Sequence, residues 1–98
     1  MKASEIQIRD PFVYVEGGRY YLYGSTDRDI WRGEGQGFEC YTSKDLQEFE
    51  PVGNVFDRPQ GYWGKVNFWA PEMHVYRGKY FLFASFKAEG VCRGTAVL

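Results

Sequence analysis

Asp10 is the residue of this sequence best placed to do chemistry. It follows Arg9 and directly precedes Pro11, at the start of the apolar run Phe12 to Val15. A carboxylate at the start of a strand is a candidate catalytic group, but an Asp before Pro is also a good turn former. Its side chain accepts hydrogen bonds from nearby backbone N–H groups. On this motif alone both interpretations of Asp10 stay open.

Four further residues have side chains that suit a sugar. Trp31, Phe68 and Trp69 offer planar faces on which a sugar ring can lie, and Asn67 offers an amide for a sugar hydroxyl. Each also has a purely structural interpretation, since the aromatic rings can pack between sheets and Asn67 can cap a turn. We expect these four residues to contribute to substrate binding.

The remaining polar residues are expected to be structural, and we expect no metal and no cofactor. Glu72 lies inside an expected strand, where a buried or hydrogen-bonded carboxylate is expected, and His74 is expected to pack as a strand residue. Asp27 and Asp29 lack the further ligands of a calcium loop and are expected to be solvated loop charges.

The elements that position Asp10 come from an internal repeat. Residues 11–25 align without gaps on residues 71–85, an offset of 60. Each copy reads as an extended run, a two-residue turn ending in Gly, and a second extended run rich in Tyr, Phe and Leu, which is a β-hairpin signal. Both faces of the second run are bulky, so we expect these strands to be covered on both sides.

Further strands are expected at 38–43, 49–56 and 94–98. Four short antiparallel strands repeated along a chain are typical of a β-propeller blade, whose first strand lines the central axis. The predicted fold class is therefore all-β, a propeller fragment with the first blade and most of the second. By the offset of 60, Asp10 and Ala70 take equivalent positions at the rim of the axis.

Three stretches resemble glycoside hydrolase family 43. The run from Ile8 to Val13 resembles the Asp-Pro start of the family's first blade, and Phe68 to Phe83 resembles its second blade with a Trp-Ala-Pro start. The segment Tyr41 to Leu46 resembles the Ser-Lys-Asp-Leu turn between outer strands. The resemblance covers nearly the whole chain.

The resemblance implies a five-bladed propeller glycosidase that hydrolyses arabinose- or xylose-containing saccharides with inversion. It implies blade 1 at about 8–57, an incomplete blade 2 at about 69–98, and Asp10 as the general base. The family's Glu general acid and second Asp come from later blades, so they would lie beyond Leu98. The alternative is a carbohydrate-binding or scaffold propeller that does no chemistry.

Composition limits the partners. The net charge of −1 comes from 12 basic and 13 acidic residues that form no basic cluster, so we expect no nucleic-acid partner. No long apolar run or secretory leader is seen, so we expect no membrane partner and a cytoplasmic location. Cys40 and Cys92 are expected to be reduced, partly buried thiols. An exposed sheet edge and apolar face favour self-association and an inactive fragment.

Overall fold

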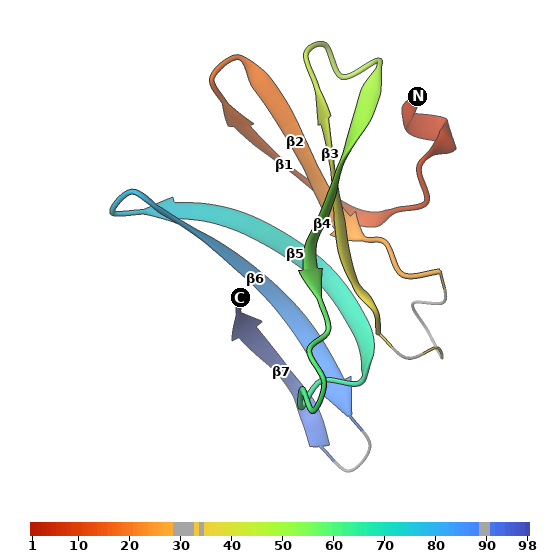
Figure 1. Cartoon of the computed structure of the whole chain (residues 1–98), viewed down its shortest axis with the longest axis vertical. Helices are drawn as coiled ribbons and strands as arrows, with labels where there is room; N and C mark the ends of the chain where they lie inside the picture. The colour runs from red at the N-terminus through yellow and green to blue at the C-terminus, as the bar shows by residue number, and fades with distance from the viewer. Residues whose placement is uncertain (29–32, 34, 89–90) are drawn as a thin grey trace.

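Two antiparallel sheets make up the fold. The computed structural model describes residues 1–28, 33, 35–88 and 91–98, and the chain follows each sheet strand by strand (Figure 1). The first sheet has the order β1-β2-β3-β4 and the second β5-β6-β7. The elements are a 3-10 turn η1 (Ala3–Glu5), β1 (Arg9–Glu16), β2 (Arg19–Ser25), β3 (Gly37–Ser43), β4 (Phe49–Asp57), β5 (Val66–Tyr76), β6 (Lys79–Ala88) and β7 (Val91–Val97).

Both predicted hairpins are confirmed. β1 turns into β2 at Gly17-Gly18, and β5 turns into β6 at Arg77-Gly78, all four with positive φ. Such turns favour Gly because a side chain is strained in the left-handed region, where Gly is not. The registers also match, since Val13 pairs with Leu22 and the equivalent Met73 pairs with Leu82.

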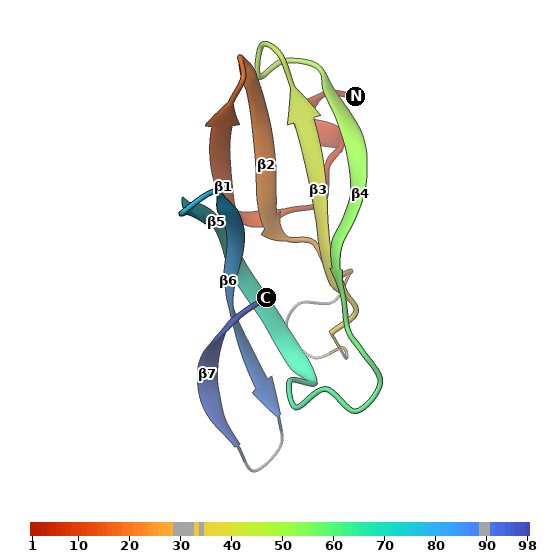
Figure 2. The same cartoon turned by 60° about the vertical axis from the view of Figure 1, so that its left-hand side comes forward.

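The main core lies between the two sheets. β5 packs against both β1 and β2, so the second sheet lies across one face of the first, as Figure 2 shows. From the first sheet this core takes Tyr23, Phe38 and Cys40, and from the second it takes Phe68, Leu82, Ala84 and Phe86. Aromatic rings meet there mostly in tilted or edge contacts, for example Phe68 and Phe86, whose centroids are 4.7 Å apart.

A smaller core lies on the opposite face of the first sheet. Ile6 and Ile8 of the N-terminal segment pack there with Leu22 and Phe49. A Cβ at Gly24 would overlap Ile8, so this glycine is what allows the N-terminal segment to approach β2. The segment therefore adds apolar cover to a sheet face that would otherwise be open.

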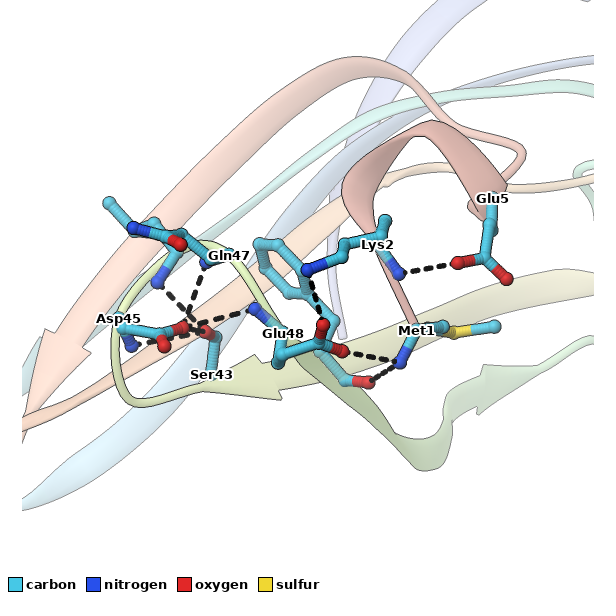
Figure 3. A network of polar contacts seen from close by, with 9 residues as sticks. Met1, Lys2, Glu5, Ser43, Asp45, Gln47 and Glu48 are labelled. Atoms are coloured by element: carbon cyan, nitrogen blue, oxygen red, sulfur yellow. Dashed lines mark hydrogen bonds and ion pairs between the residues drawn. The ribbon is translucent and has the colours of Figure 1, made fainter.

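The β3–β4 turn anchors the first residues of the chain (Figure 3). Lys2 forms an ion pair with Glu48, and the amino group of Met1 donates to the Phe49 carbonyl at 2.9 Å. Asp45 accepts hydrogen bonds from the backbone N–H groups of Glu48 and Gln47, which lower the pKa of its carboxyl. The turn thus fixes both the sheet edge and the N-terminus.

The burial of the cysteines and the cover of the second strand of each hairpin were both predicted from the sequence. Cys40 is a buried free thiol, as expected, while the side chain of Cys92 lies outside those that the structure describes. Within this chain β6 is covered on one side only, since Phe83 is 37% exposed, which agrees with the apolar face that the sequence predicted to be exposed. The other sheet covers only one face of β6, and the face that carries Phe83 remains open to solvent.

Candidate functional site

Asp10 lies in a β-bulge at the start of β1. Arg9 pairs with Ser25 and Phe12 pairs with Tyr23, so Asp10 and Pro11 together oppose the single residue Gly24. Pro11 is tolerated there because a bulge leaves a backbone position without a ladder hydrogen bond, and proline has no N–H to donate. Bulges re-aim side chains, and this one turns the backbone at the proposed catalytic residue.

The same bulge recurs at the equivalent place in the second hairpin. Trp69 pairs with Ser85 and Glu72 with Phe83, which leaves Ala70 and Pro71 opposite Ala84. Asp10 has a φ of 48° and Ala70 a φ of 49°, both left-handed. The two copies of the repeat therefore share an unusual backbone conformation as well as an apolar pattern. Asp10 and Ala70 are equivalent in structure as well as in sequence.

A left-handed backbone costs free energy at both positions. For a residue with a Cβ the cost is about 1–2 kcal/mol, although Asp and Asn adopt this region more readily than Ala. Strained backbone of this kind concentrates at functional sites, where surrounding structure enforces it. Asp10 is also exposed, so its carboxylate is accessible at the start of β1, an edge strand of the first sheet.

Ser25 links the two bulges. Its Oγ accepts a hydrogen bond of 2.8 Å from the backbone N–H of Ala70, and its backbone pairs with Arg9. Ser25 is only 1% exposed, so its side of this hydrogen bond is shielded from water. One buried hydroxyl therefore holds the bulge of β5 beside the start of β1.

Ser25→Ala is expected to destabilise the protein by about 1–3 kcal/mol, because it leaves the part-buried Ala70 N–H without its acceptor. Urea unfolding followed by circular dichroism measures the change. Ser4→Ala, at an exposed position, is the matched control and should leave the unfolding midpoint nearly unchanged. Equal midpoints for the Ser25→Ala variant and the unaltered chain would contradict this role of Ser25.

Asp27 is not the solvated loop charge expected from the sequence. It is 8% exposed, and its carboxylate accepts hydrogen bonds from the backbone N–H groups of Gln36 and Gly37. Burial raises the pKa of this carboxyl, while the two backbone hydrogen bonds act in the opposite direction. Asp27 therefore holds the start of β3 next to the end of β2. Asp29, with which it was grouped, lies outside the described residues.

A polar hollow of about 310 Å³ opens beside Asp27. Gln7 donates from its amide nitrogen to the Asp27 carbonyl at 2.8 Å and forms part of the wall. Asp10 lines neither this hollow nor the larger apolar one on the second sheet. In this chain Asp10 thus lies at the exposed edge of the first sheet and not in either hollow.

Phe68 is not a sugar-contacting residue in this structure. Its exposed fraction is 0%, and its ring packs against Phe38 and Phe86 and over Gly35, where a Cβ would overlap the ring. Burial in the inter-sheet core therefore replaces the predicted role in binding. The backbone N–H of Gly35 also donates to the Lys65 carbonyl at 2.6 Å, which holds Gly35 beside the residue that precedes β5.

The other three predicted binding residues, Trp69, Asn67 and Trp31, do not share the burial of Phe68 in the described structure or lie outside it. Trp69 and Asn67 are half-buried at the start of β5, close in sequence to the second bulge, and Asn67 is left-handed with a φ of 52°. Their contact with a ligand stays a prediction. Trp31 lies outside the described residues.

Glu72 lies inside a strand as expected, since it belongs to β5 and pairs with Phe83, and its carboxylate has a polar partner, but it is not buried. Its side chain is 54% exposed and lies 3.4 Å from the His74 Nε2. His74 packs against Phe12 and Phe83, with ring centroids 5.6 and 5.5 Å away, yet its side chain is 53% exposed. Both residues thus belong to the rim of the open sheet face.

Within the described ranges, no three His, Cys, Asp or Glu side chains come close enough together to hold a metal ion. Over the same ranges the structure has no helix of the length and apolar character needed to cross a membrane.

The sequence analysis did not predict the bulge at Asp10, the hydrogen bond of Ser25 to Ala70 or the burial of Asp27. The sequence carried a signal for the first two, since Asp10-Pro11 and Ala70-Pro71 precede Ser25 and Ser85 at the same spacing. Paired prolines and serines at the repeat offset indicate a shared local structure. Nothing in the pattern around Asp27 marked it as buried.

Known proteins resemble this chain over nearly its whole length. The sequence profile of the family described as Glycosyl hydrolases family 43 matches residues 4–97. The chain belongs to this family. A curated relative, the extracellular endo-alpha-(1->5)-L-arabinanase 1 of Bacillus subtilis (strain 168), is 28% identical over 94 residues, which cover 90% of this chain and 28% of the relative.

Solved structures of family 43 proteins superpose on the two sheets. An endo-arabinase from Bacteroides thetaiotaomicron VPI-5482 has a TM-score of 0.81 and 33% identity. The superposition covers 99% of this chain and 32% of the endo-arabinase chain. A thermostable family 43 glycoside hydrolase has a TM-score of 0.77 and 29% identity. The superposition covers 93% of this chain and 28% of the hydrolase chain. The predicted fold class, an all-β propeller fragment with a first blade and most of a second, is confirmed.

The family 43 chain spans about a third of the length of these relatives. The predicted cytoplasmic location is not supported, because the Bacillus relative is described as extracellular. The sequence argument had rested on the residues at the start of the chain, which carry no information about a leader outside it.

Proposed function

We propose that this chain supplies the general base, Asp10, of a glycosidase that hydrolyses arabinose-containing saccharides with inversion. The observation that carries the proposal is the bulge at Asp10, an exposed carboxylate with a φ of 48° at the start of β1. The arabinanase relatives support an α-1,5-linked arabinan as the substrate class. The xylose-containing saccharides that the sequence also allowed have no such support.

In the proposed reaction Asp10 takes a proton from a water molecule as that water attacks the anomeric carbon. A carboxylic acid on the opposite side of the sugar protonates the leaving oxygen, and the two carboxyl groups lie roughly 6.5–9.5 Å apart to leave room for the water. We expect the acid, and an Asp that orients it, from a part of the enzyme outside these 98 residues. Blades at about 8–57 and 69–98 within a five-bladed ring are part of the same proposal.

The stereochemistry of the product tests the proposal. We would replace the equivalent third of the Bacteroides endo-arabinase with residues 1–98 and follow arabinan hydrolysis by proton NMR. The first product formed should be the β-anomer, which then mutarotates. An α-anomer as first product would indicate retention, with a carboxylate acting as nucleophile, and would contradict the role given to Asp10.

A further inference from the structure

The direction of the Asp10 side chain is set by the bulge that carries it. Asp10 and Pro11 together oppose Gly24, and a bulge of this kind re-aims the side chains of its residues. The left-handed backbone at Asp10, with a φ of 48°, is costly for a residue with a Cβ, so it persists only where neighbouring structure enforces it. The contacts that enforce the bulge therefore decide where the Asp10 carboxylate lies.

Backbone contacts hold this bulge from the side of β2. Arg9, which precedes Asp10, pairs with Ser25, the last residue of β2. A Cβ at Gly24 would lie 2.8 Å from the Arg9 carbonyl oxygen, so the missing side chain lets this part of the chain lie close against β2. The bulge is thus fixed to β2 at the residue directly before the proposed base.

Ser25 extends this contact to the second sheet. Its backbone pairs with Arg9, while its hydroxyl accepts a hydrogen bond of 2.8 Å from the Ala70 N–H, within the equivalent bulge of β5. Arg9 precedes Asp10 and Ala70 follows Trp69, so one side chain joins the proposed base to the expected sugar-binding tryptophan. Ser25 is 1% exposed, and a hydrogen bond shielded from water is electrostatically stronger than an exposed one.

We propose that Ser25 is a positioning residue, which holds the Asp10 carboxylate at a fixed distance from the sugar bound at Trp69. The inference rests on the proposed function, since it takes Asp10 as the general base. Ser25 touches neither the attacking water nor the sugar and acts through the two bulges. Without its hydrogen bond the sheets keep their core, but the bulges of β1 and β5 can shift against each other.

Proton abstraction is sensitive to such a shift. The base must lie within about 2.6–3.2 Å of the attacking water, and a displacement of roughly 1 Å can lower a rate about 10²-fold. The apolar core around Phe68 and Phe86 holds the sheets together, but hydrophobic contacts have no preferred direction. The Ser25 hydrogen bond does have one, because its strength depends on both distance and angle. It therefore sets the relative position of the bulges more narrowly than the core does.

The kinetic constants of two variants test the proposal. In the endo-arabinase that carries residues 1–98, Ser25→Ala should lower kcat for arabinan hydrolysis at least tenfold. The KM should change less than twofold, because Ser25 does not contact the sugar. Circular dichroism and the melting temperature report that the variant still folds.

Thr26→Val is the matched control. It also removes a hydroxyl that accepts a hydrogen bond from a backbone N–H, that of Glu39 at 2.9 Å. Thr26 is 9% exposed and follows Ser25 directly, but this hydrogen bond holds β3 and not the bulge of β5. Thr26→Val should therefore lower the melting temperature about as much as Ser25→Ala and leave kcat within about twofold. Equal loss of kcat in the two variants would overturn the proposal.

A second substitution separates positioning from stability. Ala70→Gly removes the cost of the left-handed backbone at Ala70, whose φ is 49°, because glycine adopts this region readily. The double variant Ser25→Ala/Ala70→Gly should melt at a higher temperature than Ser25→Ala. Its kcat should stay low, because the hydrogen-bond acceptor is still missing. Recovery of kcat together with the melting temperature would show a merely structural role for Ser25 and overturn the proposal.

Asp10→Asn in the same enzyme distinguishes failure of this inference from failure of the proposed function. The expected result is a loss of kcat in both Asp10→Asn and Ser25→Ala. Loss in Asp10→Asn with unchanged kcat in Ser25→Ala would leave Asp10 as the base and overturn the role of Ser25 alone. Turnover that survives Asp10→Asn would overturn the proposed function, and the positioning role with it.

Discussion

Asp10→Asn is expected to lower kcat for arabinan hydrolysis about 10²–10⁴-fold in the endo-arabinase that carries residues 1–98 of this chain. The amide cannot accept the proton of the attacking water. Asn has nearly the same shape as Asp and also tolerates a left-handed backbone, so the bulge with a φ of 48° should persist. Initial rates with a soluble arabinan measure the effect.

Two controls separate the chemistry of Asp10 from its structural role. Asp57→Asn changes an exposed carboxyl at the end of β4 and should leave kcat within about twofold. Binding of an arabino-oligosaccharide to the Asp10→Asn variant, measured by calorimetry, should be retained. Loss of binding together with turnover would favour a turn-forming role for Asp10, and unchanged turnover would exclude it as the base.

Phe68→Ala is expected to destabilise the chain by about 3–5 kcal/mol, the usual cost of deleting a buried phenyl ring. The ring has no exposed surface and touches Phe38, Phe56 and Phe86, so its removal leaves a cavity between the sheets. Since domains of this size are stable by only about 5–15 kcal/mol, much of the protein should unfold at low urea.

Phe83→Ala is the matched control for Phe68→Ala. It removes the same ring from a position that is 37% exposed on the open face. Its effect on the free energy of unfolding should be well below half that of Phe68→Ala. Similar losses for the two variants would show that Phe68 does not form the inter-sheet core in solution.

The sheets could be predicted well because their signal is local. A two-residue turn containing Gly between apolar runs specifies a hairpin, and its recurrence at the repeat offset specified a second copy. The turns at Gly17-Gly18 and Arg77-Gly78 formed as expected. The third and fourth strands of the first sheet were also found within one residue of their observed bounds, Gly37–Ser43 and Phe49–Asp57.

The site was harder to predict because burial depends on contacts between distant segments. Phe68 stands next to Trp69 in the sequence, which does not reveal that Phe38, far earlier in the chain, packs against its ring. Asp27 looked like a loop charge, yet the backbone N–H groups of Gln36 and Gly37 surround its carboxylate. Asp10, whose surroundings are set by its own hairpin, lies in a bulge that matches the one at Ala70, the position that the repeat makes equivalent.

The position of Asp10 relative to a bound substrate is the most direct test of this account. A crystal structure of the grafted endo-arabinase with an arabino-oligosaccharide would measure the distance between the Asp10 carboxylate and the water nearest the anomeric carbon. We predict about 2.6–3.2 Å, with the water on the side of the sugar opposite the leaving oxygen. A carboxylate turned away from the sugar, with no water between them, would contradict it.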